Sequence, residues 1–177
     1  MEKLFQKLRS ITFDFNGKIE NESLRRFLHI FTEMGSTIGA ILIIGILTYI
    51  SGVNVLYVFV PIYLFQLLIV EALKILFRKP RPASHQHKNL FGIRITSGSF
   101  PSGHTSNIFS LCFLISNFYQ LNILLTLAVF AVAGVIAFSR ILLGRHYTID
   151  VAAGALCGLA FSVIGAMLLP NLLRFTL

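Results

Sequence analysis

Two histidines and a carboxylate stand out as residues that could do chemistry. Asp150 follows His146 by four positions, which places both side chains on one face if the segment is helical. A carboxylate bonded to one imidazole nitrogen fixes the tautomer of the ring and supports the cation that forms when the other nitrogen attacks. A second histidine, His104, could protonate a leaving alkoxide. This pattern predicts nucleophilic catalysis with His146 as nucleophile, Asp150 as its partner and His104 as acid.

Three basic residues lie in or beside long apolar segments, where a charge is costly unless it has a function: Lys74, Arg81 and Arg140. Cations that converge on one point suit a phosphate group, whose oxygens accept several charge-assisted hydrogen bonds. Ser102 and Gly103 directly precede an expected helix and add backbone N–H donors at its positive end. Together with the histidines, these residues provide what a phosphoryl transfer through a phosphohistidine intermediate requires.

The same residues carry a resemblance to a known family. The chain is similar to the type 2 phosphatidic acid phosphatase superfamily, in its bacterial-like membrane lipid phosphatase branch. The three-part signature reads Lys74 with Arg81-Pro82, then Pro101 to His104, then Ser139-Arg140 with His146 and Asp150. The resemblance implies catalysis without a metal or other cofactor, on a lipid phosphate substrate. It also implies that His146 is the nucleophile, His104 the acid and Asp150 the partner, and that phosphate is bound by Lys74, Arg81, Ser102, Gly103 and Arg140.

The elements that must position these residues are transmembrane helices. The 177 residues are 55% hydrophobic and only 12% charged, against about 25% charged in an ordinary soluble domain. We expect one all-α integral-membrane domain over 1–177, a polytopic bundle of about five spans. The expected spans are 27–50, 54–77, 104–119, 122–143 and 149–169. With five spans, the end of the second span, the start of the third and the turn between the fourth and fifth all lie on one face of the membrane, so the three parts of the signature converge as a site in a helix bundle requires.

Two segments outside the spans complete the expected organisation. Leu4, Leu8 and Ile11 recur on one helical face, with the basic residues Lys3, Lys7 and Arg9 beside them. Residues 1–26 are therefore predicted to hold an amphipathic helix that lies on the membrane interface. Residues 78–103 form the long polar connection and are predicted to be the active-site loop.

Other polar residues leave alternatives open. His85 and His87 could form a metal site with His104, although the loop offers neither a carboxylate nor a cysteine, and headgroup or water contact is the favoured interpretation. Arg78, Lys79 and Arg145 flank the signature and are candidates for headgroup binding. Glu71 could pair with Lys74 three positions later. The net charge of +8 would suit nucleic acid, but the basic residues adjoin apolar spans, so we expect no nucleic-acid partner.

The sequence predicts a phosphatase and leaves its substrate and oligomeric state open. Candidate substrates are phosphatidylglycerol phosphate, undecaprenyl diphosphate, phosphatidic acid and the 1-phosphate of lipid A. Alternatives are an anion or lipid transporter without hydrolytic activity, or a vanadate-dependent oxidase.

Fourteen of the fifteen Lys and Arg residues lie on the active-site side of the expected five-span bundle, which favours a cytoplasmic site by the positive-inside rule. Bacterial lipid members of the family usually face outward, and on that resemblance we expect an inner-membrane protein with a periplasmic or extracellular site.

Overall fold

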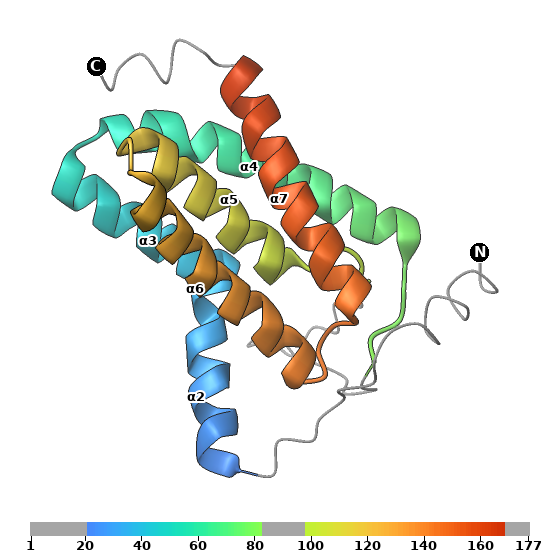
Figure 1. The fold of residues 1–177 in the computed structure, drawn as a ribbon. Helices are drawn as coiled ribbons and strands as arrows, with labels where there is room; N and C mark the ends of the chain where they lie inside the picture. The colour runs from blue at the N-terminus through green and yellow to red at the C-terminus, as the bar shows by residue number, and fades with distance from the viewer. Residues whose placement is uncertain (1–20, 83–97, 169–177) are drawn as a thin grey trace.

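The structure, a computed structural model, describes residues 21–82 and 98–168. Within these ranges the regular elements are all helical, and the all-α prediction is confirmed (Figure 1). The expected interfacial residues Leu4, Leu8 and Ile11, and His85 and His87 of the loop, lie outside the described ranges. The helices are α2 (Glu22–Thr32), a 3-10 turn η1 (Glu33–Gly35), α3 (Thr37–Ser51), α4 (Asn54–Phe77), α5 (Gly103–Phe118), α6 (Ile123–Leu142) and α7 (Thr148–Leu168).

Three of the helices begin at a residue whose side chain caps them. Asn21 accepts a hydrogen bond from Leu24 N at 3.0 Å and starts α2. Ser36 does the same for α3, and Asn122 for α6. Each cap satisfies one of the N–H groups that the first helical turn leaves without a partner.

The first expected span is two helices and not one. The segment Glu22–Gly35 is bent by 63° from α3. Ser36 has an extended backbone (φ −70°, ψ 164°), which ends one helical path and caps the next. Hydropathy alone could not reveal this break, because apolar residues continue on both sides of it. In Figure 1, α2 extends away from the bundle at the bend.

The helix α5 lies at the centre of the bundle and contacts α3, α4, α6, α7 and η1. Its packing against α7 is very close: a Cβ at Gly154 would lie 2.6 Å from the main-chain oxygen of Ser102. Buried polar pairs also join α5 to its neighbours, with Gln66 Nε2 donating to Ser106 Oγ at 2.6 Å. The start of α5 is therefore held in a fixed position relative to the start of α7.

The helices α4, α6 and α7 are long and apolar enough to cross a membrane, and the bent pair α2–α3 could add a fourth span. Large side chains such as Leu68, Leu127 and Leu156 are exposed on them, as lipid-facing residues would be. The described residues thus give three to four candidate spans of a multi-pass membrane protein, where the sequence predicted about five. The difference comes mainly from α5, which has only 16 residues and is enclosed by other helices.

Candidate active site

The turn between α6 and α7 places His146. Gly144 has a positive φ of 64°, a conformation that glycine adopts without steric cost. Gly144 N donates to Ile141 O at 2.9 Å and Arg145 N donates to Arg140 O at 3.0 Å, the paired bonds of a Schellman motif. His146 N reaches the same Arg140 carbonyl at 3.3 Å. The chain therefore reverses directly after α6, and His146 lies beside the end of the helix that carries Arg140.

The imidazole of His146 is buried, with only 4% of the residue exposed, and is held by a main-chain group. Its Nδ1 lies 2.9 Å from the carbonyl oxygen of Ser99. Because a carbonyl oxygen can only accept, Nδ1 must carry the proton and donate it. The lone pair of the neutral ring is then on Nε2. This is the tautomer that a nucleophile attacking through Nε2 requires.

The sequence predicts a direct hydrogen bond between Asp150 and His146, but the two side chains do not form one. Its Oδ2 lies 3.9 Å from Nδ1, beyond hydrogen-bond distance, and accepts instead from Tyr147 N at 3.0 Å. That contact closes the first turn of α7 in the manner of a capping box. Asp150 Oδ1 accepts from Lys79 Nζ at 2.6 Å. The carboxylate is thus a cap and an ion-pair partner, and acts on His146 through its charge.

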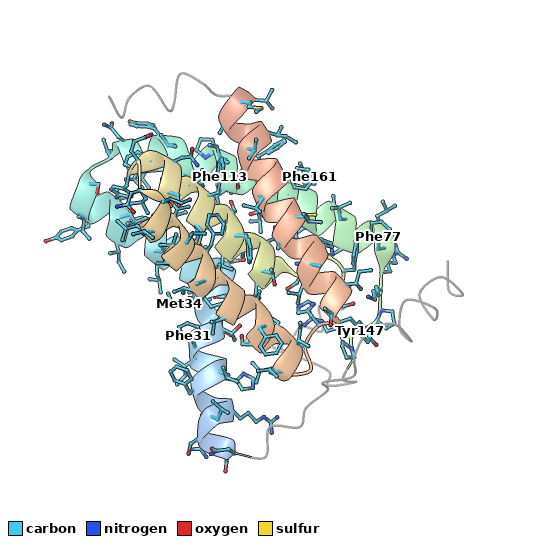
Figure 2. The ribbon with its side chains drawn as sticks, in the orientation of Figure 1. Phe31, Met34, Phe77, Phe113, Tyr147 and Phe161 are labelled. Atoms are coloured by element: carbon cyan, nitrogen blue, oxygen red, sulfur yellow. The ribbon has the colours of Figure 1, made fainter. Side chains whose placement is uncertain are left out.

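The end of α4 brings Lys74 and Arg81 to the same place (Figure 2, where Phe77 and Tyr147 lie at this end of the bundle). Lys74 is 9% exposed and donates to Glu71, the pairing that the sequence suggests. A Cβ at Gly103 would lie 2.7 Å from Lys74 Nζ, so the ammonium lies against the first residue of α5 and a larger residue there would displace it. Arg78, with a φ of 44°, ends α4 and turns the chain toward Arg81.

The start of α5 offers backbone donors. Ser102 is fully buried, and its N–H donates to the main-chain oxygen of Asp150 at 2.9 Å. Its hydroxyl accepts from Thr105 Oγ1 at 3.0 Å and makes no capping bond to the helix. Gly103 and the next residues therefore present their N–H groups at the positive end of α5. Such a helix start is suited to a phosphate.

Arg140 and His104 face this point with unused hydrogen-bonding capacity. Arg140 is 7% exposed and donates from one terminal nitrogen to Thr32 Oγ1 at 3.3 Å. Among the described residues, neither Arg140 Nε nor His104 Nε2 has a hydrogen-bond partner, although both atoms are buried. Glu33 Oε1 lies 3.9 Å from His104 Nε2 and provides a counter-charge there. Buried polar atoms of this kind are normally satisfied, so both suit the oxygens of a bound anion.

The electrostatics of the turn keep His146 neutral. Burial, together with the positive charges of Arg140 and Arg81, lowers its pKa to about 4, although Asp150 acts in the opposite direction. Burial also lowers the pKa of Arg81, an effect that the carboxylates of Asp150 and Glu71 offset in part. Arg81 nevertheless stays charged at neutral pH, since a guanidinium is not deprotonated in proteins. A neutral imidazole thus lies within a positive field.

The structure gathers the predicted residues at one end of the bundle: Lys74, Arg81, Ser102, Gly103, His104, Arg140, His146 and Asp150. Sequence reasoning missed Ser99, whose carbonyl fixes the ring. It also assigned Lys79 to the headgroup, whereas that side chain is buried against Asp150. A main-chain acceptor 47 positions before His146 leaves no signal in the sequence. The one available hint on Asp150 was its place as the third residue of a helix, where acidic residues cap.

The described ranges hold no group of three His, Cys, Asp or Glu residues that could bind a metal ion. His85 and His87 lie outside these ranges, so the metal alternative for them stays untested.

The sequence matches the PAP2 superfamily over residues 55–174, about two thirds of the chain. The chain belongs to this superfamily. The fold agrees: the crystal structure of LpxE from Aquifex aeolicus superposes with a TM-score of 0.68 at 25% identity, over 85% of this chain and 90% of that one. The resemblance to the membrane lipid phosphatase branch is therefore confirmed.

Two relatives carry names that bear on chemistry. A probable lipid phosphate phosphatase beta of Arabidopsis thaliana is 31% identical over 137 residues, which are 63% of this chain and 62% of that protein. A lipid A 4'-phosphatase of Porphyromonas gingivalis is 27% identical over 170 residues, covering 90% of this chain and 71% of the relative. The chain thus spans less than two thirds of the length of the plant relative.

Proposed function

We propose that the protein hydrolyses a phosphate monoester or diphosphate of a membrane lipid through a phosphohistidine on His146. The observation that carries this proposal is the neutral, buried imidazole whose Nδ1–H is fixed by Ser99, leaving a lone pair on Nε2 in the positive field of Arg140 and Arg81. An imidazole held in this way is an activated nucleophile rather than a charge clamp. A transporter site would need the cations but not the fixed tautomer.

The reaction has two steps. In the first, His146 Nε2 forms a bond to phosphorus, the bond between phosphorus and the lipid oxygen breaks, and His104 gives its proton to that oxygen. In the second, His104 takes a proton from water, the water oxygen attacks phosphorus, and the bond to Nε2 breaks to release phosphate. Lys74, Arg81, Arg140 and the N–H groups at Gly103 neutralise the phosphoryl oxygens throughout. The charge of Asp150 supports the ring while it is cationic.

The experiment is a phosphate-release assay on purified protein in mixed lipid–detergent micelles. The panel contains phosphatidylglycerol phosphate, undecaprenyl diphosphate, phosphatidic acid and lipid A carrying a 1-phosphate or a 4'-phosphate. We expect release from at least one lipid, unchanged by a chelator, and lost by about 10⁴-fold or more in His146→Ala. Undiminished release in that variant would refute the nucleophile, and loss with chelator would refute the metal-free mechanism.

We further propose that the site faces the periplasm or cell exterior, on the strength of the family resemblance. Lys74, Arg81 and Arg140 serve phosphate and should be left out of the positive-inside count. The helix α7 runs from the site at Asp150 to the opposite end of the bundle at Leu168 (Figure 1). A reporter fused after Leu177 is therefore expected in the cytoplasm. An external signal there would reverse the assignment.

A further inference from the structure

Lys79 differs from its neighbour Arg78 because its charge is buried. Only 6% of the residue is exposed, and its Nζ donates to Asp150 Oδ1 at 2.6 Å. Asp150 is fully buried as well. The neighbouring Arg78 is exposed and donates to the Ile75 carbonyl on its own helix. Lys79 therefore points into the site. A contact with a lipid headgroup would instead require its side chain to point outward.

The ammonium is enclosed by aromatic rings from two other segments. Lys79 Nζ lies 4.5 Å from the centroid of the Tyr147 ring and 5.8 Å from that of Phe100. Cations at these distances from a ring face are attracted to it. The side chain thus binds together the end of α4, the segment before α5 and the start of α7.

The main chain of the same residue holds the group that orients the nucleophile. Ser99 N donates to Lys79 O at 2.7 Å, and Ser99 Oγ donates to Pro80 O at 3.0 Å. The carbonyl of Ser99 then accepts the hydrogen bond from His146 Nδ1. An unbroken series of contacts therefore runs from Lys79 to the imidazole by way of Ser99, and another by way of Asp150.

We infer that Lys79 is the positioning residue of the nucleophile. Its ammonium neutralises Asp150 and keeps that carboxylate on the N–H of Tyr147, so that the carbonyl of Ser99, and not Asp150, sets the orientation and tautomer of His146. This inference rests on the proposed function of the site. It goes further by assigning the control of the ring to a residue outside the three-part signature.

The charge balance around His146 explains why Lys79 matters. Without its ammonium, the uncompensated carboxylate of Asp150 would be free to accept the hydrogen bond from Nδ1, which lies 3.9 Å away. The ring would turn away from Ser99 and become more basic. The charged or titratable groups around the ring come from the end of α4, the start of α5, the end of α6 with its turn, and α7: Lys79, Arg81, His104, Arg140, Arg145 and Asp150.

A double-mutant cycle tests the inference, with Lys79→Met, Asp150→Asn and the combination of both. Each single variant leaves one buried charge without its counterpart, whereas the combined variant leaves none. In Lys79→Met we expect the pKa of His146 to rise by about one unit or more, and kcat to fall about 10- to 100-fold with little change in KM. We expect the combined variant to regain about tenfold of the activity that Asp150→Asn loses. Lys79→Arg, which keeps the charge, should retain most of the activity.

The pKa and tautomer of His146 are read from ¹⁵N-histidine NMR spectra of the full chain in micelles, with the signal assigned by its loss in His146→Ala. Arg78→Met removes an exposed charge one residue away and should leave this titration unchanged. An unchanged titration in folded Lys79→Met would overturn the inference. If Lys79→Met does not fold, the combined variant decides: a retained Nδ1–H tautomer supports the inference, and a lost one refutes it. The NMR result stands even if no lipid is hydrolysed, so failure of the proposed function would be distinguishable.

Discussion

The surroundings of His146 and His104 differ in how completely the protein fixes each ring. His146 lies in a closed turn, with its Nδ1 on Ser99 and its backbone on the end of α6. The side chain of His104 is 24% exposed, and its Nε2 faces the carboxylate of Glu33 at 3.9 Å with no hydrogen-bond partner in ranges 21–82 and 98–168. A nucleophile benefits from a fixed, neutral ring, whereas an acid must reach toward a leaving group that the substrate brings. The side of the site around His146, called the closed side, thus suits the nucleophile. The side around His104 and Glu33, called the open side, suits the acid.

Removing His104 should give the largest effect that distinguishes the two sides. In His104→Ala we expect kcat to fall by about 10²- to 10⁴-fold on a lipid monoester, because the leaving alkoxide then departs without a proton. A substrate with an acidic leaving group, such as a nitrophenyl phosphate, should lose far less. Phosphate release across a series of leaving groups measures this.

The loss in His146→Ala should not depend on the leaving group, and this variant provides the contrast. Equal losses for all leaving groups in His104→Ala would show that His104 is not the acid.

The pH dependence should report the closed side. A protonated His146 has no lone pair on Nε2, and burial among cations lowers its pKa to about 4. Protonation of His146 should therefore leave kcat/KM unchanged from neutral pH down to about pH 4. Below that pH it should lower kcat/KM about tenfold per pH unit. An unshifted imidazole would begin to fall near pH 6.5.

The second ionisation of a phosphate monoester lies near pH 6 and must be measured separately for the substrate. An NMR titration of His146 without substrate removes that ambiguity. A value near 6.5 would contradict the account of the closed pocket.

Glu33→Gln should give the smallest effect, on the open side. The carboxylate is 65% exposed, and exposed ion pairs contribute little. We expect a loss of a few-fold in kcat, larger for poor leaving groups than for good ones, because the counter-charge beside His104 is gone. Glu22→Gln is the matched control, since Glu22 is an exposed carboxylate on α2 that pairs with Arg26. Identical behaviour of the two variants would leave Glu33 without a role at His104.

The same contrast explains what the sequence could and could not predict. The long apolar segments were sufficient to predict an all-α bundle, and the positions of Lys74, His104, Arg140 and His146 along them predicted one site, because alternating crossings bring these residues to one end. The partner of His146 could not be predicted, since the bond goes to the main chain of Ser99 and any residue type has that carbonyl.

Two other features were hidden for related reasons. The sequence did not distinguish the buried Lys79 from its exposed neighbour Arg78, because the sequence of a basic loop does not reveal the direction in which a side chain points. The 63° bend before α3 was missed because a hydropathy window averages over the cap at Ser36. Both depend on contacts that form only in the folded bundle.

The most direct test of the central claim is to locate the phosphoryl group during turnover. Protein is mixed with an active lipid, quenched in alkali, in which phosphohistidine is stable, digested, and analysed by mass spectrometry. The account predicts one added phosphoryl group on His146, forming and decaying as fast as phosphate is released. A phosphoryl group on another residue, or full release with His146 unmodified throughout, would contradict it.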